Sequence, residues 1–249
     1  MNYSNYLKEI IRDKGILSSA YSVFHNYSIG NQLMAASQLN GRGVELSPIA
    51  SYKKWQELGR QVKKGAKAIE LIMPVTVKDK NDADKMRSFF IAKRNWFTLN
   101  DTEGNDYQHE VKTPAWDKNA ALLALDIKQV NFENLNGNCQ GYAVDKKIAV
   151  NPLAILPHKT TFHEIAHIVL GHTLENNLMS DSDITPRDIR EVEAESVAYI
   201  LCSLLNLKGL EESRGYIQNW LSGGDIPDKS AQKIFNCADK ILKAGAITE

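Results

Sequence analysis

Two histidines and a glutamate lie close together in the chain, at a spacing that suits metal chemistry. Residues 162–172 read FHEIAHIVLGH, which places His163 and His167 four positions apart. On a helix, such side chains project from one face, where two imidazoles can share one metal ion. Glu164 follows His163, where a carboxylate can take a proton from a metal-bound water and pass it to a leaving amine. The stretch therefore predicts His163 and His167 as metal ligands and Glu164 as catalytic acid and base.

The neighbours of the two histidines favour this interpretation. They are apolar all round the predicted helix: Phe162, Ile165, Ala166, Ile168, Val169 and Leu170. Such a helix is expected to be buried, and two imidazoles and a carboxylate are costly to bury without a metal. Two core histidines with ordinary hydrogen-bond partners are the alternative. Zn²⁺ is the default metal for these ligands, and another divalent ion such as Mn²⁺ is the second choice.

A catalytic zinc site also needs a third protein ligand and an open position for water. His172 lies five residues past His167, a rotation of about 140° around a helix, and is expected to be a helix-end histidine. Glu191 and Glu195 stand four apart on one side of the next predicted helix. We expect Glu191 to be the third ligand and Glu195 to accept the outer N–H of a ligand histidine, with the reverse assignment open. Glu193 is expected to be solvated, and a plain charged helix face is the alternative for all three glutamates.

The elements that must position these residues follow from hydrophobic periodicity and capping signals. A helix is predicted from Trp116 to Leu125, and short strands over 128–132, 141–144 and 147–150, with a hairpin turn at Asp145 and Lys146. Further helices are predicted over 158–171, 186–206, 211–221 and 228–243. Thr185 and Pro186 supply an N-cap and a first turn for the second of these helices. This half of the chain is therefore expected to be mostly helical with a small sheet.

The first half is expected to mix helices and strands. Residues 3–40 show helical periodicity, with a second helix from about Ile29. Ser51 and Gly59 flank a short predicted helix. Alternating apolar residues then predict one strand over 69–77, and a second strand is expected over 88–98.

Charge divides the chain in the same way. The 249 residues have a formal net charge of zero, yet residues 1–98 carry +8 and residues 99–249 carry −8. Residues 100–114 have the polar composition of a linker. We therefore expect an α+β protein of two domains, residues 1–115 and residues 116–249.

Several classes of protein are excluded by the composition. No window approaches the roughly 18 apolar residues of a membrane helix, and the first residues lack the pattern of a signal peptide. The three cysteines are widely spaced and predict reduced thiols without a disulfide framework. We therefore expect a cytoplasmic protein without a membrane partner.

The basic half offers the side chains that single-stranded DNA requires, which are cations for the phosphates and aromatic rings for the bases. The candidates within residues 52–67 are Tyr52, Lys53, Lys54, Trp55, Arg60, Lys63, Lys64 and Lys67. Lys93, Arg94 and Trp96 are expected to extend this track. In the alternative interpretation, the lysines form a solvated face and the rings of Trp55, Phe89 and Phe90 belong to the core. No motif for base-specific reading of a duplex is present.

Longer stretches resemble a known family. The segments GYAVDKKIAVNPLAILPHKTTFHEIAHIVLGH, REVEAESVAYILC and SRGYIQNWL look like the metallopeptidase-like domain of ArdC-type antirestriction proteins, and more distantly like ImmA/IrrE peptidases. FHNYSIGNQLMAASQ and PIASYKKWQELGRQVKKGAKAIELIMP look like the N-terminal single-stranded-DNA-binding domain of ArdC proteins. The resemblance implies single-strand binding and protection of incoming plasmid DNA from restriction. It also implies His163 and His167 as ligands, Glu164 as acid/base, and the stretch from Glu191 to Glu195 as the source of the third ligand.

Together these observations predict a basic single-strand-binding module followed by a gluzincin-like metallopeptidase domain acting on a protein or peptide. Two other functions remain open. In one, the metal only ties two helices together and DNA binding alone blocks a nuclease. In the other, the protein is an ImmA-like peptidase that cleaves a DNA-bound regulator.

Overall fold

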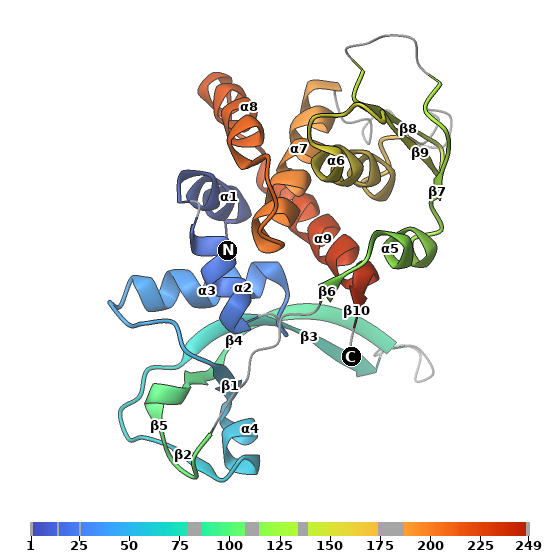
Figure 1. Ribbon diagram of the computed structural model, residues 1–249. Coiled ribbons are helices and arrows are strands. Elements are labelled where there is room, and N and C mark those ends of the chain that lie inside the picture. Colours follow the sequence, from blue (N-terminus) through green and yellow to red (C-terminus); the bar gives the residue numbers. More distant parts are fainter. Residues whose placement is uncertain are drawn as a thin grey trace. The chain divides into compact units, whose positions relative to one another are not determined.

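The computed structural model describes residues 2–13, 15–24, 26–78, 86–107, 115–133, 139–173 and 187–247. The chain forms two compact units, which Figure 1 shows in sequence colours. Unit 1 consists of Met1–Ser18 and Thr113–Glu249, and unit 2 consists of Ser19–Lys112. Helices and small sheets occur together, which confirms the expected α+β class. The contacts of the chain place its first eighteen residues in unit 1, whereas the charge pattern grouped them with the basic half.

Unit 1 is built mainly of helices. They are α1 (Tyr3–Arg12), α5 (Lys118–Ala124), α6 (Pro157–Val169), α7 (Arg187–Leu204), α8 (Leu210–Gly223) and α9 (Asp228–Gly245). Helix α2 (Gly15–Phe24) spans the division between the units. Helix α7 packs against α6, α8 and α9, and every residue from Val192 to Leu204 is buried. This central helix therefore forms the core on which α6 is positioned.

Helix α1 belongs to this core although it is far away in sequence. Its apolar residues Leu7, Ile10 and Ile11 are buried, and it packs against α9 and α8. The hydroxyl of Tyr199 on α7 donates to the carbonyl of Ile10 at 2.9 Å. The backbone N–H of Ser4 donates to a carboxylate oxygen of Asp228 at 3.1 Å. These bonds explain why α1 joins unit 1.

A small sheet flanks α6 in unit 1, and its strands are β7 (Lys128–Gln129), β8 (Gly141–Val144) and β9 (Lys147–Val150). Strands β8 and β9 form the predicted hairpin, with Asp145 at φ 52° in its turn.

Trp116 was expected to begin a helix, but it lies in strand β6 (Ala115–Trp116), which pairs with β10 (Ala246–Ile247). Helix α5 starts after it because Asp117 caps the helix by accepting from the N–H of Ala120 at 2.6 Å. Thr185 and Pro186 lie outside the described residues.

Unit 2 contains α3 (Ile29–Asn40), α4 (Tyr52–Glu57) and a sheet in the order β1-β4-β3. The strands are β1 (Ile49–Ser51), β3 (Ile69–Lys78) and β4 (Met86–Thr98), and β3 and β4 form a long antiparallel hairpin. The Oγ of Ser51 accepts from the N–H of Lys54, and Gly59 has φ +72°, so both predicted ends of α4 are confirmed.

Two amide side chains of α3 hold the free edge of β3. Asn31 bonds to both the N–H and the carbonyl of Ile72, at 2.9 and 2.8 Å. Gln38, two turns later on α3, bonds to both backbone groups of Glu70, at 3.0 and 2.8 Å. An edge strand leaves such groups open to pairing with another chain, so α3 protects this part of the hairpin.

Part of the expected linker is folded. Strand β5 (Thr102–Gly104) pairs with β2 (Arg60–Val62), and a 3₁₀ turn over Leu99–Asp101 precedes it. Thr98 and Asp101 form a capping box at this turn. The remainder of the expected linker, residues 108–114, lies outside the described residues.

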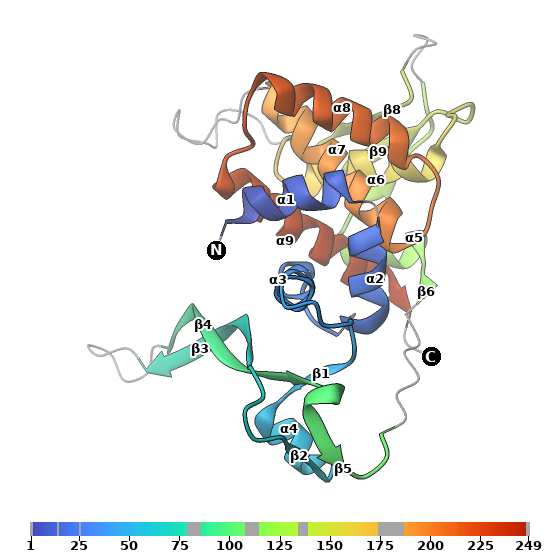
Figure 2. The same cartoon turned by 90° about the vertical axis from the view of Figure 1, so that its left-hand side faces the viewer.

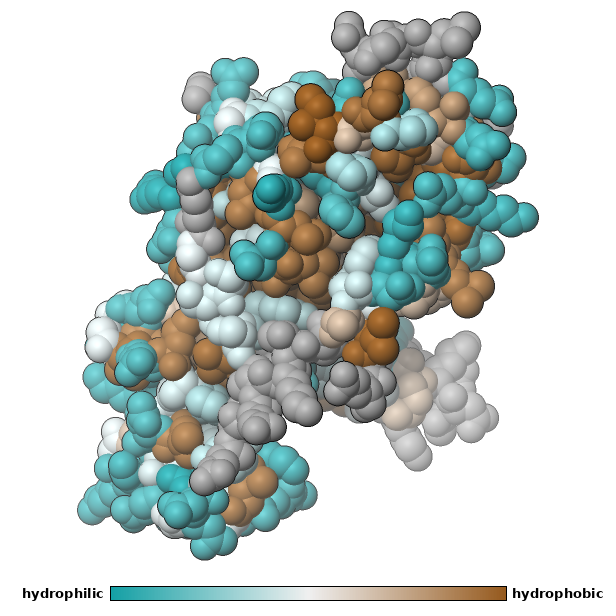
Figure 3. Space-filling view, in the orientation of Figure 1, coloured by the Kyte–Doolittle hydropathy of each residue, from teal (hydrophilic) through white to brown (hydrophobic). Residues whose placement is uncertain are grey.

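Part of the surface of unit 2 is hydrophilic. Figure 3 shows mainly hydrophilic side chains over the region of α4, β2 and β5.

The three cysteines are free, as predicted, and burial raises the pKa of Cys202 to about 12. None of the helices in the described ranges is long and apolar enough to cross a bilayer.

Candidate metal centre

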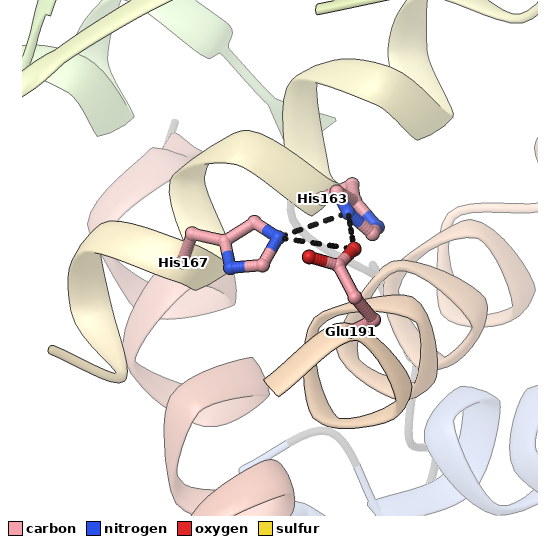
Figure 4. Close-up of side chains that lie close together, drawn as sticks. All are labelled: His163, His167 and Glu191. Atoms are coloured by element: carbon pink, nitrogen blue, oxygen red, sulfur yellow. Dashed lines mark hydrogen bonds and ion pairs between the residues drawn. The ribbon is translucent and has the colours of Figure 1, made fainter. Parts of the chain in front are cut away.

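The two histidines of the HExxH stretch meet a glutamate of the neighbouring helix. Figure 4 shows the rings of His163 and His167 reaching from α6 toward the carboxylate of Glu191 on α7. The two Nε2 atoms lie 3.0 Å apart. Oε2 of Glu191 lies 3.4 Å from Nε2 of His163 and 3.7 Å from Nε2 of His167. Three ligand atoms thus face one point.

The spacing of these atoms suits one small cation. A tetrahedral ion with ligand distances near 2.0–2.1 Å holds its ligand atoms about 3.3 to 3.4 Å apart. The three separations in the structure, 3.0, 3.4 and 3.7 Å, bracket that value. The side chain of Glu191 is 40% exposed, so the centre is open to solvent on this side. The donor set of two imidazoles and one carboxylate fits a divalent metal.

The outer nitrogen of His163 is held by Glu195. Its Nδ1 lies 3.0 Å from Oε2 of Glu195, and Nζ of Lys159 lies 2.6 Å from the other carboxylate oxygen. Burial raises the pKa of Glu195, but the bonds from His163 and Lys159 outweigh burial and lower it to about 2. Burial alone lowers the pKa of His163, yet its bonds to Glu191 and Glu195 raise it to about 9 in the absence of a metal. Glu195 therefore contacts the outer side of the ring, whereas Glu191 contacts the inner side.

The outer nitrogen of His167 is held through a second histidine. Its Nδ1 lies 3.0 Å from Nδ1 of His172, whose Nε2 lies 2.9 Å from Oε2 of Glu193. Burial lowers the pKa of His172 and so favours the neutral ring. A carboxylate only accepts, so the proton of His172 belongs on Nε2 and its Nδ1 accepts from His167. Nε2 of His167 then keeps its lone pair for a metal.

Two expectations are corrected by this chain of contacts. Glu193 was expected to be solvated, but it is 0% exposed. It faces the side of α7 opposite Glu191, and this helix is buried on all sides over that stretch. His172 does stand at the end of α6, where its N–H donates to the carbonyl of His167 at 2.8 Å. Its side chain, however, is buried between His167 and Glu193 and is more than a helix-end group.

Glu164 lies beside the three ligand atoms but is not one of them. It is 7% exposed, and burial raises the pKa of its carboxyl, against the lowering effect of His163 and His167. A Cβ added to Gly141 on β8 would lie 3.1 Å from Oε1 of Glu164, so glycine leaves room for this carboxylate. A raised pKa suits a group that takes up and returns a proton near neutral pH.

Sequence reasoning missed Lys159 and the pairing of His172 with Glu193. Lys159 stands four residues before His163, which is the same helical spacing that links the two histidines. That spacing could have indicated a group on the metal-facing side of α6. The contact of Glu193 with His172 joins residues 21 positions apart, and the sequence holds no signal for it.

The structure places some residues of the predicted nucleic-acid track of unit 2 in the core and others on the surface. Trp55 is 1% exposed, its Nε1 donates to the carbonyl of Phe97 at 2.9 Å, and its ring forms a T-shaped pair with that of Tyr107. Trp55 is therefore a core residue and offers no face to a base, which corrects its place on the track. The guanidinium of Arg60 bonds to Thr102 and Asn105 and ties β2 to β5.

The other members of the track lie on the surface. Lys53, Lys64 and Lys67 are exposed. Lys54 pairs with Glu57 at 3.4 Å, and Nζ of Lys63 donates to the carbonyl of Asn100 at 3.0 Å.

Exposed aromatic rings occur at other positions than the sequence suggested. The hydroxyl of Tyr52 accepts from Gln61 at 3.2 Å, and its ring, 38% exposed, lies edge-on to Phe97. Phe89 and Phe90, by contrast, are 46% and 75% exposed, so neither belongs to the core.

Comparisons with known proteins relate this chain to ArdC proteins, by sequence over its first part and by fold over nearly its whole length. The family model of the N-terminal domain of anti-restriction factor ArdC matches residues 8–114. The fold is similar to the metal-free crystal structure of the antirestriction protein ArdC from the R388 plasmid, with a TM-score of 0.53 and 21% identity. The Mn(II)-bound structure of the same protein gives a TM-score of 0.52 at 21% identity. Both alignments cover 97% of this chain and 94% of the other. No curated protein sequence matches this chain.

Proposed function

We propose that the chain, whose residues 8–114 match the N-terminal domain of ArdC and whose fold is similar to that of ArdC, is an antirestriction protein with a divalent metal site in unit 1 and a single-strand-binding surface in unit 2. In this proposal the metal site hydrolyses a peptide bond, and the protein acts in the cytoplasm on incoming DNA. The observation that carries the proposal is the convergence of His163, His167 and Glu191, whose ligand atoms lie within 4.8 Å of one another.

A divalent ion is the cofactor of this proposal. The R388 protein has been crystallised with Mn(II), and two imidazoles with one carboxylate also form a common catalytic zinc site. Zn²⁺ is our first choice and Mn²⁺ the second. When bound, the ion supplies Lewis-acid chemistry that polarises a carbonyl and makes water nucleophilic.

The residues of the chain have distinct tasks in the reaction. Glu164 takes the proton of the attacking water and returns it to the leaving amine, for which its raised pKa is suited. Glu195 and the His172–Glu193 pair hold the outer nitrogens of the two ligand histidines, so that both Nε2 atoms face inward. The 40% exposed side chain of Glu191 leaves a side on which a peptide can approach.

A purely structural metal is less well supported. A structural zinc site closes with four protein ligands. Among the described residues, the cluster of possible ligands contains His163, His167 and Glu191, without a cysteine and without His172. His172 contacts the outer nitrogen of His167 and cannot also face the ion. This arrangement supports an open position for water.

The proposed function can be tested on the full chain in one experiment. Fluorescence polarisation with single- and double-stranded oligonucleotides measures DNA binding by the wild type and by Glu164→Gln, and elemental analysis of the same samples measures their metal content. The proposal predicts about one metal ion per chain and preferential single-strand binding in both proteins. A wild type that holds no divalent metal, or that binds neither oligonucleotide, would contradict it.

A further inference from the structure

The outer half of the β3–β4 hairpin exposes large apolar side chains. Phe90 is 75% exposed, Met86 59%, Phe89 46% and Val77 41%. Figure 2 shows this end of the hairpin extending beyond α3, whose side chains hold the strand at Glu70 and Ile72. Apolar side chains gathered in this way on a solvent-facing hairpin indicate a surface that contacts a partner.

The register of the hairpin places one ring on each face. Phe89 lies opposite Val75, and Phe90 lies opposite Pro74. Because successive side chains of a strand point to opposite faces, the two rings stand back to back across the sheet. A chain that lies along either face of the two strands could therefore meet an aromatic ring.

Cationic side chains accompany both rings. Arg87 and Lys93 share the face of Phe89, and Arg94 shares the face of Phe90. Glu70 is the one acidic residue among the described residues of the two strands. Its carboxylate lies 3.0 Å from Nε of Arg94 at the inner end. The hairpin thus combines exposed rings with positive charge, with Arg87 in its outer half and Lys93 and Arg94 nearer its inner end.

We propose that the outer half of the β3–β4 hairpin, centred on Phe89 and Phe90, is the surface on which single-stranded nucleic acid stacks its bases. In this proposal Arg87 and Lys93, on the face of Phe89, meet the phosphates, because single-strand binding combines a cationic track with aromatic faces. In a duplex the base faces are covered by their neighbours, so this surface selects the single strand. The proposal rests on the proposed function of unit 2 and names the residues that perform it.

The hairpin suits this task better than the track predicted over residues 52–67. There the indole of Trp55 is buried, and the ring of Tyr52 is partly covered by Phe97. Exposed lysines remain at Lys53, Lys64 and Lys67, but lysines alone supply charge without stacking. The stacking faces lie on the hairpin.

The test uses the full-length protein and a fluorescent oligothymidylate of about 20 nucleotides at low salt. The variants are Phe89→Ala, Phe90→Ala and Phe90→Trp, with Leu153→Ala as the control because Leu153 is an exposed apolar residue of unit 1, 86% exposed. Circular dichroism melting confirms that each variant is folded. Since each stacked base contributes a factor of roughly 5 to 150 in affinity, we expect each Ala variant to raise Kd by that factor. Phe90→Trp and Leu153→Ala should bind like the wild type.

The outcomes separate this inference from the function on which it rests. If the wild type binds the oligonucleotide and both Ala variants bind equally well, the hairpin inference is wrong and single-strand binding stands. If the wild type does not bind, the proposed function of unit 2 fails and the inference fails with it. Sedimentation velocity adds one more outcome. A wild-type dimer that Phe90→Ala dissociates at unchanged DNA affinity would make the hairpin an interface between two copies and overturn the proposal.

Discussion

Nδ1 of His172 lies 3.0 Å from Nδ1 of His167, on the side of the His167 ring that faces away from Glu191. His172 in turn bonds to Glu193, which is fully buried. A buried carboxylate thereby fixes, through one neutral imidazole, which nitrogen of His167 carries the proton. Glu195 fixes the protonated nitrogen of His163 in the same way, by a direct contact with its Nδ1. Both ligand histidines are therefore prepared to bind a metal through Nε2.

This arrangement predicts that Glu193 supports metal binding without touching the metal. Replacing Glu193 by Gln keeps the size of the side chain but lets its amide donate toward His172. This disturbs the positions of the protons on the rings of His172 and His167. We expect metal affinity to fall about 10- to 100-fold, the usual effect of such outer partners. Competition against a chromophoric chelator measures it. Glu212→Gln, an exposed glutamate on α8, is the matched control, and equal affinities of the two variants would refute the role of Glu193.

The raised pKa of His163 predicts a pH-dependent metal affinity. Without a metal, its bonds to Glu191 and Glu195 outweigh burial and raise this pKa to about 9. A metal must displace that proton, so the affinity should rise by up to about tenfold per pH unit from pH 7 and level off above pH 9. Titration of the metal-free protein at several pH values measures this. An affinity independent of pH over this range would show that His163 is neutral before the metal binds.

The lowered pKa of Glu195 predicts acid sensitivity of the metal-free fold. Its folded value, about 2, lies below the ordinary value of 4.5 because the bonds from His163 and Lys159 outweigh burial. A lowered carboxyl pKa stabilises the fold above the ordinary value, and this stabilisation is lost as the pH falls from about 4.5 toward 2. Urea unfolding between pH 5 and 2.5 should show a shallower pH dependence in Glu195→Gln than in the wild type. Parallel curves would contradict the ion-pair role of Glu195.

Trp55 and Lys53 lie on the same short helix but should respond differently to substitution. Trp55→Ala removes a buried indole and should lower the free energy of unfolding by about 3 to 5 kcal/mol. Lys53→Ala changes an exposed side chain and should alter it by no more than about 0.5 kcal/mol. Denaturant unfolding distinguishes them. A Trp55→Ala protein as stable as the wild type would mean that the indole is not in the core.

The sequence allowed most of the fold to be predicted where the signals are local. The HExxH helix, the β8–β9 turn and both ends of α4 follow from spacing, turn residues and capping, and the structure confirms them. The location of α1 in unit 1 could not be predicted, because it depends on bonds such as that of Tyr199 to Ile10, 189 positions apart. The polar composition of residues 102–104 predicted part of a linker, but these residues form a strand that pairs with β2.

The candidate site was predictable to a similar degree. Helical spacing predicted His163 and His167 as ligands and left Glu191 and Glu195 open for the third position. The structure brings His163, His167 and Glu191 together. The burial of Glu193 depends on what packs around α7, and that is a tertiary property. The exposure of Phe89 and Phe90 could have been suspected, since adjacent strand residues cannot both face one core.

The most direct test of the account measures bound metal per chain after equilibration with Zn²⁺ or Mn²⁺ and removal of excess ion. The wild type, Glu164→Gln and Glu191→Ala are compared by elemental analysis, with circular dichroism as the control for folding. The account predicts about one ion per chain in the wild type and in Glu164→Gln, and a loss of most of it in Glu191→Ala. Full metal content in Glu191→Ala, or loss of the metal in Glu164→Gln, would contradict the assignment of ligands and base.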